Sequence, residues 1–242
     1  MLNIKILSVV FVLILFFKSN HSFAFGVKLT TVEFNLLHRT CQLFYASTNA
    51  GRRHGFATNF SEDELRKANI QAEKTGGAWH YCAGVALLNR AQQTSHPIKK
   101  LGALRQSLEE IDFTARNIKP DNSMYGEVHL NRARALFQLD QTEKSREVLN
   151  KLIQTHPRYV PGYIELARQH DKQGKTNQAI DILNKVDPEL QRSSADFNYF
   201  IGMYYFKTKN YEKAKYHAKA AYAMGYPLPG LRRMLREKGH AI

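Results

Sequence analysis

The sequence predicts an all-α protein: a solenoid of antiparallel helix pairs, preceded by further helices and closed by a capping helix at its C-terminus. Two observations lead to this fold. A unit recurs three times within residues 126–229, with small residues, polar turns and closing prolines in register. Elsewhere, apolar residues recur at the spacing of one helix face. Because one helix pair cannot bury its own apolar stripe, stacked pairs are expected to share a continuous core.

Residues 1–24 are predicted to be a secretory signal peptide. Lys5 precedes an apolar run of 12 residues, 6–17, and small residues lead to a cleavage site after Ala24. The run is shorter than the roughly 20 apolar residues that a spanning helix needs, which favours cleavage over an uncleaved anchor in the inner membrane. The sequence therefore predicts an exported protein, in the periplasm of a Gram-negative bacterium.

The chain is strongly basic. Its formal net charge is +14, and Lys5 and Lys18 belong to the signal, which leaves 14 − 2 = +12 for the mature protein. Such a charge favours anionic partners, namely acidic polypeptides, lipid headgroups or glycans. Export argues against nucleic acid. A scattered basic surface that only keeps the protein soluble is the alternative explanation.

Residues 25–75 are predicted to form an N-terminal helical region. Residues 31–47 have their apolar side chains on one side and are interpreted as one amphipathic helix. Residues 48–60 contain glycines and arginines and are interpreted as a basic loop. A further helix is expected after Ser61, because Ser61 and Glu64 have the spacing of a capping box.

The chain has two cysteines, Cys41 and Cys82. In an oxidising compartment such a pair can form a disulfide, which would here join the first helix to the helix that contains Trp79. Two buried free thiols are the alternative. The spacing excludes a C-x-x-C redox motif, and two cysteines are too few for a cysteine-based zinc site.

Residues 76–120 are predicted to form a divergent helix pair. In the first helix, Trp79, Cys82 and Ala86 share one face. In the second, Leu101 and the apolar residues that follow it recur at helical spacing up to a proline. A loop around residues 93–100 separates the two helices. This region is interpreted as a fourth unit with an insertion, or as a separate helix pair.

Three regular units follow within residues 126–229. A first small residue recurs with spacings of 34 and 35, at Ala133, Ala167 and Gly202. A second recurs with the same spacings, at Ser145, Ala179 and Ala214. A polar turn lies between the two small residues, and a proline closes each unit, at Pro157, Pro188 and Pro227. The small residues permit two antiparallel helices to approach closely.

This pattern resembles the tetratricopeptide repeat (TPR) family, which has L-G, Y, A, A and P at fixed positions in its repeat. The third unit matches best, with Gly202, Tyr205 and Ala214 at the family's positions. The first unit departs most, with Arg132 in place of leucine and Ser145 in place of alanine. The resemblance covers roughly residues 126–229; it is specific for the fold and does not indicate a chemistry.

The tripeptide Gly174-Lys175-Thr176 matches the end of a phosphate-binding P-loop. The first glycine of that motif would stand at Gln169, and the segment before it is predicted to be a helix instead of a strand. Nucleotide binding is therefore excluded here. The tripeptide is expected to form the turn within the second unit, with Gly174 ending one helix and Thr176 capping the next.

The C-terminal segment, residues 230–242, is predicted to be a short basic amphipathic helix. Leu231 and Leu235 lie on one face, and arginines occupy the other. A terminal unit of a solenoid needs such a cap. A helix lying on a membrane surface is the alternative.

No enzyme, metal site or cofactor is predicted. The ten histidines show no metal-ligand spacing, and neither G-x-S-x-G nor G-x-G-x-x-G occurs. The acidic residues Glu109, Glu110 and Asp112 are spread around a helix and are interpreted as a solvated face.

In the TPR family, the first helix of each pair lines a concave surface, and the resemblance places a peptide-binding groove on the corresponding residues. Among the positions carried over are Leu130, Arg134, Phe137, Ile164, Arg168, Lys172, Tyr199, Met203, Phe206 and Lys207. Arg134 and Arg168 are expected to bind carboxylates. Phe137, Tyr199 and Phe206 are expected to be apolar anchors. The alternative is that some of these residues pack under the neighbouring helix.

Together these features predict a non-enzymatic adaptor of the cell envelope. It would bind a peptide or helix of another envelope protein, through acidic residues or a free C-terminal carboxylate of that partner. By resemblance, such proteins help to assemble envelope complexes. The alternative function is an envelope module that binds anionic glycan or lipid through its basic surface.

Overall fold

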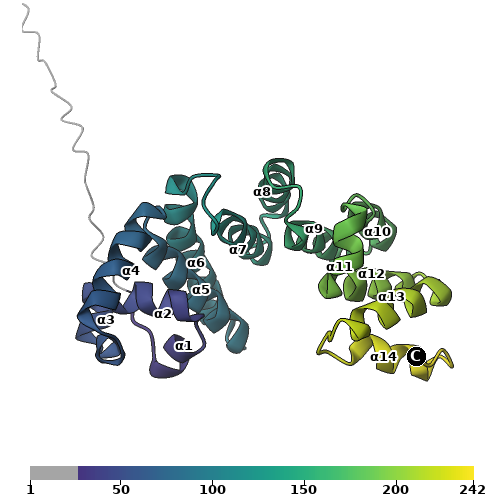
Figure 1. The fold of residues 1–242 in the computed structure, drawn as a ribbon, viewed down its shortest axis with the longest axis horizontal. Coiled ribbons are helices and arrows are strands. Elements are labelled where there is room, and N and C mark those ends of the chain that lie inside the picture. Colours follow the sequence, from purple (N-terminus) through teal and green to yellow (C-terminus); the bar gives the residue numbers. More distant parts are fainter. Residues whose placement is uncertain (1–26) are drawn as a thin grey trace, which may run out of the picture.

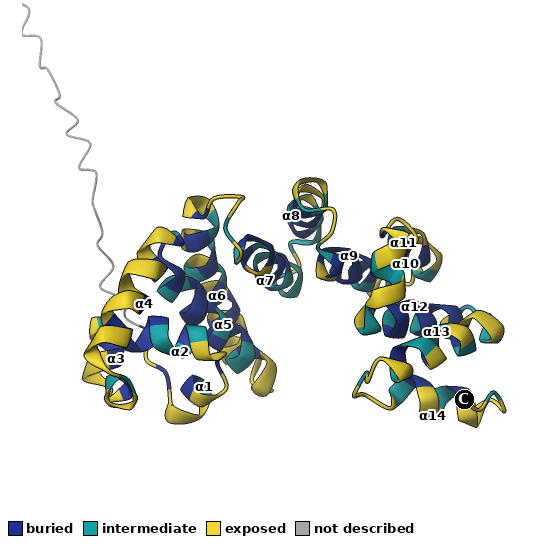
Figure 2. Cartoon of the chain, in the orientation of Figure 1, coloured by how far each residue is buried: buried dark blue, intermediate teal, exposed yellow. Residues whose placement is uncertain are grey.

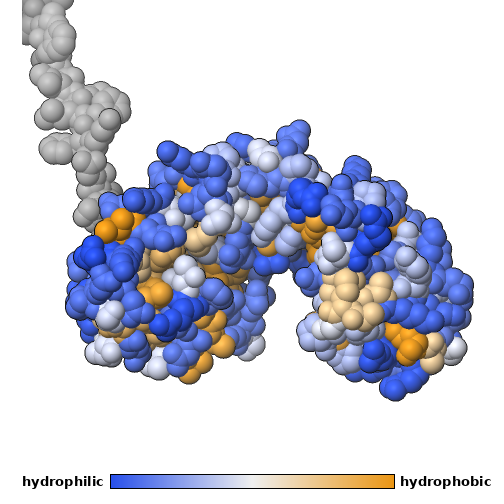
Figure 3. Space-filling view, in the orientation of Figure 1, coloured by the Kyte–Doolittle hydropathy of each residue, from blue (hydrophilic) through white to orange (hydrophobic). Residues whose placement is uncertain are grey.

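A computed structural model describes residues 27–242, which form fourteen α-helices, one 3-10 helix and no strand. The predicted signal peptide, residues 1–24, lies outside the described residues. The helices form an arch (Figure 1), with α1–α6 at one end, α7 and α8 in the middle and α9–α14 at the other end. A space-filling view shows the hollow between the two ends (Figure 3). The predicted all-α solenoid is confirmed.

The N-terminal region consists of helices, most of them short, that pack on one another and on α5 (Ala78–Gln93). They are α1 (Thr31–Asn35), α2 (Arg39–Ala46), α3 (Asn49–Arg53), η1 (Phe56–Asn59) and α4 (Glu62–Lys74). Phe34 stacks on Phe56 with ring centroids 4.2 Å apart, and the buried Tyr45 hydroxyl donates to the carbonyl of Val27 at 2.5 Å. The capping box of Ser61 and Glu64 at the start of α4 is confirmed.

Two cross-links join this region to α5. Cys41 on α2 forms a disulfide with Cys82 on α5, across 41 residues of sequence. Arg90 on α5 donates from Nε to Glu33 on α1 at 2.5 Å. That hydrogen bond is the main reason why the pKa of Glu33 is lowered to about 2.

Two predictions for this region are wrong. The single helix predicted over residues 31–47 is broken at Leu36–His38, where His38 caps α2 by accepting from the Thr40 amide. The predicted loop over residues 48–60 contains α3 and η1, because the Thr48 side chain accepts from the Gly51 amide at 3.0 Å and starts a helical turn. A Cβ on Gly51 would lie 2.2 Å from the Tyr45 carbonyl oxygen, so only glycine fits this contact.

The helix pair predicted in residues 76–120 is α5 (Ala78–Gln93) and α6 (Pro97–Asn117). The two helices touch at Gly84, where the buried Ser107 hydroxyl donates to the Gly84 carbonyl at 2.7 Å. The connecting loop is shorter than predicted, because Pro97 begins α6. Leu101 is 41% exposed and does not belong to the core that its spacing predicted.

Three helix pairs follow at the predicted positions. They are α7 (Tyr125–Gln138) with α8 (Thr142–Thr155), α9 (Val160–Lys172) with α10 (Thr176–Leu183), and α12 (Ala195–Lys207) with α13 (Tyr211–Ala223). The small residues at their contacts are fully buried, as Ala133, Ala167 and Ala214 illustrate. A short extra helix, α11 (Pro188–Ser193), precedes α12. Figure 2 shows the buried faces of the pairs turned toward one another.

The turn inside each pair has a residue in the left-handed conformation. These residues are Asp140 (φ 60°), Gly174 (φ 77°) and Lys209 (φ 63°), and Gly174 ends α9 as predicted. Thr176 does not cap α10, which is a correction. It is the first residue of that helix, and its hydroxyl donates to Asp171 Oδ1 at 2.9 Å, so it closes the turn onto the preceding helix.

The last helix, α14 (Gly230–Glu237), covers the end of the array. Leu231 and Leu235 are fully buried, whereas Arg232, Arg233 and Arg236 are exposed, as the amphipathic pattern predicts. Throughout residues 27–242, none of the helices combines the length and the apolar character needed to cross a bilayer.

Candidate functional site

The inner side of the arch contains a groove of about 860 Å³, which we call the concave groove. Its walls come from α5, α6, α7, α9 and α12, so four consecutive layers of the solenoid contribute to it. It is the surface on which the sequence placed the binding residues.

Six of the predicted residues meet in this groove: Leu130, Arg134, Phe137, Ile164, Arg168 and Lys172. Leu130 and Ile164 are only 4% and 8% exposed, so they mainly support its floor. Phe137 and the three cations are the members of this set that a partner can reach.

The other four predicted residues do not line the groove. Tyr199 is buried and stacks on Tyr226, with ring centroids 4.0 Å apart. Phe206 packs against Tyr211, and Lys207 pairs with Asp171. Met203 is partly buried in the same core as Tyr199. The C-terminal segment and α14 pack on this part of α12 and bury Tyr199, whereas Lys207 is engaged by Asp171 of α9.

Further residues complete the groove. Asp196 and Phe200 line it from α12, and α5 contributes Val85, Leu88, Asn89 and Gln92. Lys100 reaches it from α6. The residues of α5 and α6 predicted a divergent helix pair, but the groove was not predicted to extend to them. In the TPR family the first helix of each pair lines the groove, and the same assignment applied to α5 would have predicted its contribution.

A buried carboxylate changes the role of the two arginines. The Glu165 side chain is 2% exposed and pairs with both Arg134, at 3.3 Å, and Arg168. Gln169 also donates to it, at 3.0 Å. Burial, the largest single influence, lowers the pKa of Arg168, but the hydrogen bonding that Arg168 donates to Glu165 and the nearby negative charge together raise it. The sequence predicted that Arg134 and Arg168 are free to bind a carboxylate of a partner. In the structure both already form ion pairs with Glu165.

This cluster keeps an excess of positive charge. Two guanidinium groups share one carboxylate, and Arg134 remains 42% exposed at its side chain. Lys172 makes no ion pair with any described residue, and its ammonium lies 5.9 Å from the centre of the Phe137 ring. Arg168 lies 5.7 Å from the same ring. The accessible chemistry is thus one aromatic ring between two cations.

A polar chain fixes the floor of the groove. Arg134 donates to Asn131 Oδ1 at 3.1 Å, and Asn131 donates to the Tyr81 hydroxyl at 2.7 Å. Tyr81 in turn donates to Glu127 Oε1 at 2.8 Å. Burial, and then the charge of Glu127, raise the pKa of Tyr81 well above its usual value, so it stays a neutral donor. These hydrogen bonds link α5 to α7, and the Arg134–Glu165 ion pair extends the link to α9. A partner therefore meets a preorganised surface.

Within residues 27–242, no three histidine, cysteine, aspartate or glutamate side chains are grouped so that they could hold a metal ion. The polar groups of the groove are paired with one another in a supporting network. The arrangement is suited to holding a segment of another molecule.

Comparison with protein families gives a match in the middle of the chain. Residues 127–159 match the family model described as the tetratricopeptide repeat. The matched segment covers α7, α8 and the turn before α9, which is the first of the three predicted units. No curated protein matches the chain.

Proposed function

Because the chain contains a tetratricopeptide repeat, a module that generally binds other proteins, we propose that it is a protein-interaction adaptor that holds a partner segment in the concave groove. The supporting observation is the convergence of Phe137, Arg134, Arg168 and Lys172 from two successive helix pairs on one preorganised surface. Proteins with such repeats are generally scaffolds, and no catalytic role is proposed.

The partner segment is proposed to combine an apolar side chain with acidic groups. Phe137 offers an apolar contact, and the neighbouring Lys172 and the excess charge of the arginine cluster favour a nearby carboxylate. Because Glu165 already occupies one side of both arginines, a carboxylate of the partner adds a second acceptor to the cluster.

The proposed location is the cell envelope, with the partner another envelope protein and complex assembly as the context. The signal-peptide pattern of residues 1–24 supports export. The disulfide between Cys41 and Cys82 supports an oxidising compartment such as the periplasm.

The alternative function, binding of anionic glycan or lipid through a diffuse basic surface, is favoured by the net charge alone. Salt separates the two. Binding through dispersed surface charge falls steeply with ionic strength, whereas a groove with an aromatic contact keeps much of its affinity.

The test is affinity capture from an envelope extract at low and at moderately high salt, followed by calorimetry with a peptide from the captured protein. The groove variant combines Phe137→Ala with Lys172→Glu. The matched control combines Tyr216→Ala with Lys219→Glu on the exposed face of α13, away from the groove.

The wild type and the control are expected to hold the same protein at higher salt, and the groove variant is expected to lose it. The peptide should bind the groove variant at least about tenfold more weakly, as expected for a lost aromatic anchor and charge. Capture of the same proteins by all three would contradict the proposal.

A further inference from the structure

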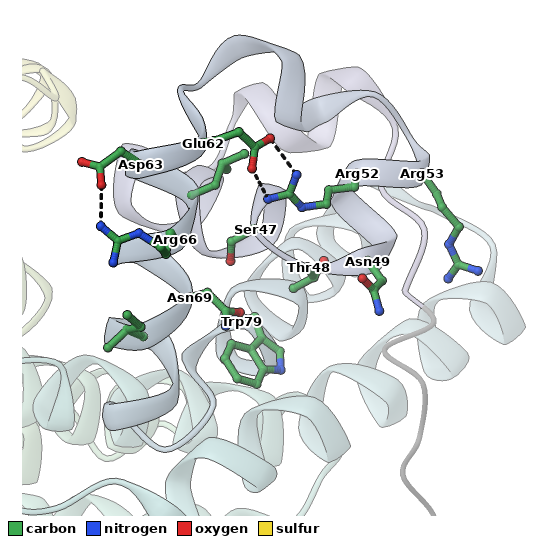
Figure 4. Close-up of a pocket in the computed structure, with 12 residues that line it drawn as sticks. Ser47, Thr48, Asn49, Arg52, Arg53, Glu62, Asp63, Arg66, Asn69 and Trp79 are labelled. Carbon is green, nitrogen blue, oxygen red and sulfur yellow. Dashed lines mark hydrogen bonds and ion pairs between the residues drawn. The ribbon is translucent and has the colours of Figure 1, made fainter.

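A second pocket lies in the N-terminal region, away from the concave groove. It has a volume of about 1240 Å³ and lies between α3, α4 and the start of α5; we call it the N-terminal pocket (Figure 4). It shares no lining residue with the concave groove. The proposed function makes no use of it.

The floor of this pocket is a small apolar surface. Trp79 lies at its base and also packs against the N-terminal core. Beside it Ile70 is 42% exposed, while Leu65 is buried beneath. The indole N–H of Trp79 has no hydrogen-bond acceptor among the described residues, and Trp79 is only partly buried. The floor therefore offers one aromatic ring with a free donor at its edge.

The rim holds fixed planar polar groups. Arg52 donates to Glu62 through two parallel hydrogen bonds, each of 2.8 Å, and Arg66 donates to Asp63 at 2.6 Å. These pairs orient guanidinium and carboxylate groups at the edge of the pocket, as Figure 4 shows.

Other polar groups of the rim are not engaged. The side-chain amides of Asn49 and Asn69 are exposed and make no hydrogen bond to another described residue. Each amide offers both donors and an acceptor. Arg53 lies at the edge without an ion-pair partner among the described residues, so three arginines face two acidic residues and leave one positive charge in excess.

From this arrangement we infer that the N-terminal pocket is a binding site for an oligosaccharide that carries an acidic group. A sugar ring has an apolar C–H face, which suits Trp79 and Ile70, and a rim of hydroxyls, which suits amides and paired charged groups. The volume exceeds the roughly 300–1,000 Å³ of pockets for drug-sized molecules, so it admits more than one sugar ring. The excess arginine favours a carboxylate on the sugar.

A protein segment fits these features less well. The centre of a protein interface is mainly apolar, and charged residues are depleted there. Here five of the twelve lining residues are charged, namely Arg52, Arg53, Glu62, Asp63 and Arg66. The inference does not depend on the proposed function, since it concerns different residues.

Trp79 is the only tryptophan of the chain, so its fluorescence reports on this pocket and the core beneath it, and not on the concave groove. The probes are tetrasaccharides at millimolar concentration: hyaluronan and oligogalacturonate, which are acidic, and chitotetraose and maltotetraose, which are neutral. At least one acidic probe is expected to shift or quench the emission in a saturable way. The groove variant Phe137→Ala with Lys172→Glu should respond like the wild type.

Two variants test the residues. Asn69→Ala should weaken binding about two- to tenfold, as expected for one lost hydrogen bond, whereas the exposed amide variant Gln71→Ala on the same helix should not. Arg53→Ala should weaken binding of the acidic probe and leave any binding of neutral probes unchanged. Calorimetry with Trp79→Phe, which keeps an apolar floor, should show weaker binding.

No response of Trp79 to any of the four probes would overturn the inference. So would a response that Asn69→Ala and Gln71→Ala leave equally intact, because binding would then lie outside the pocket. Equal affinity for acidic and neutral probes would overturn the acidic specificity.

Discussion

The pairs α5–α6 and α7–α8 are closed by the same contact, although their sequences differ. In α5–α6, the Ser107 hydroxyl donates to the Gly84 carbonyl at 2.7 Å. In α7–α8, the Ser145 hydroxyl donates to the Ala133 carbonyl, also at 2.7 Å. In both, a small residue on the first helix meets a buried serine on the second. The family model matches residues 127–159, across α7–α8, so the same closing contact occurs in a pair that matches the model and in a pair of different sequence.

The two pairs differ in what surrounds them. α7–α8 lies between two neighbouring pairs and relies on periodic packing. α5 has the short N-terminal helices on one side and α7 on the other, and the disulfide and the Arg90–Glu33 pair tie it to the former. The pair α5–α6 is thus covalently anchored, whereas α7–α8 is held by packing against its neighbours.

Removing the disulfide should have the largest effect on the difference in stability between the two regions. For the 41-residue separation, the chain-entropy account predicts a loss of about 3–4 kcal/mol in the free energy of unfolding of the N-terminal region. Urea unfolding with and without reductant, followed by Trp79 fluorescence and by far-UV circular dichroism, measures it. Reduction should move the Trp79 transition to lower urea than the bulk of the helical signal.

The control is the double variant Cys41→Ser with Cys82→Ser, which should match the reduced protein and ignore reductant. If reduction leaves the urea midpoint of the Trp79 transition unchanged, packing alone holds the short helices. The disulfide would then not anchor α5.

Adding a methyl group at the close contacts gives a smaller effect. A Cβ on Gly84 would lie 2.5 Å from Ile111 Cγ1 and 3.0 Å from the Ser107 carbonyl oxygen. Gly84→Ala should therefore cost about 1–3 kcal/mol despite its better helix propensity. Gly202→Ala should cost less, because its Cβ would meet the end of the Leu231 side chain, which can move. Thermal unfolding of both variants measures the two losses of stability. Equal losses would mean that α5 can shift away from α6.

Substituting the buried serine of each pair should give the smallest difference in the free energy of unfolding. Ser107→Ala removes one hydrogen bond, and about 0.5–1.5 kcal/mol is expected. Ser145→Ala should cost more, because Gln169 Nε2 donates to the Ser145 hydroxyl at 2.8 Å and would lose that acceptor while remaining buried. Parallel urea titrations of the two variants make the comparison. A larger cost for Ser107→Ala would show that α8 gains little from its contact with α9.

The regular part of the fold is predictable from the sequence, because the recurring small residues mark helix contacts directly. Ala133 and Ala167 are fully buried where the period of the repeat places them. The first part of the N-terminal region is less predictable, because its helices from α1 to η1 have at most eight residues and are shorter than the window over which periodicity is detected. There Thr48 was the one local signal for α3, and it was interpreted as part of a loop.

The groove was predictable only in part. Positions on α7 and α9 follow from the repeat, since each of these helices lies between two stacked helix pairs. Tyr199 fails because the C-terminal segment packs on α12 and buries it. Glu165 could not be assigned from spacing, because its partnership with Arg134 connects two different repeats and depends on how these stack.

The disulfide also has a mechanical consequence. It joins α2 to α5, and α5 forms one wall of the concave groove. Tension applied between the N-terminus and a ligand in the groove would pass through the sulfur atoms and bypass α3 and α4. The 41-residue segment that it spans could contribute roughly 140 Å of extension only after the bond is reduced. The oxidised protein would thus transmit a pull as a short, stiff link, and the reduced protein as a long, compliant tether.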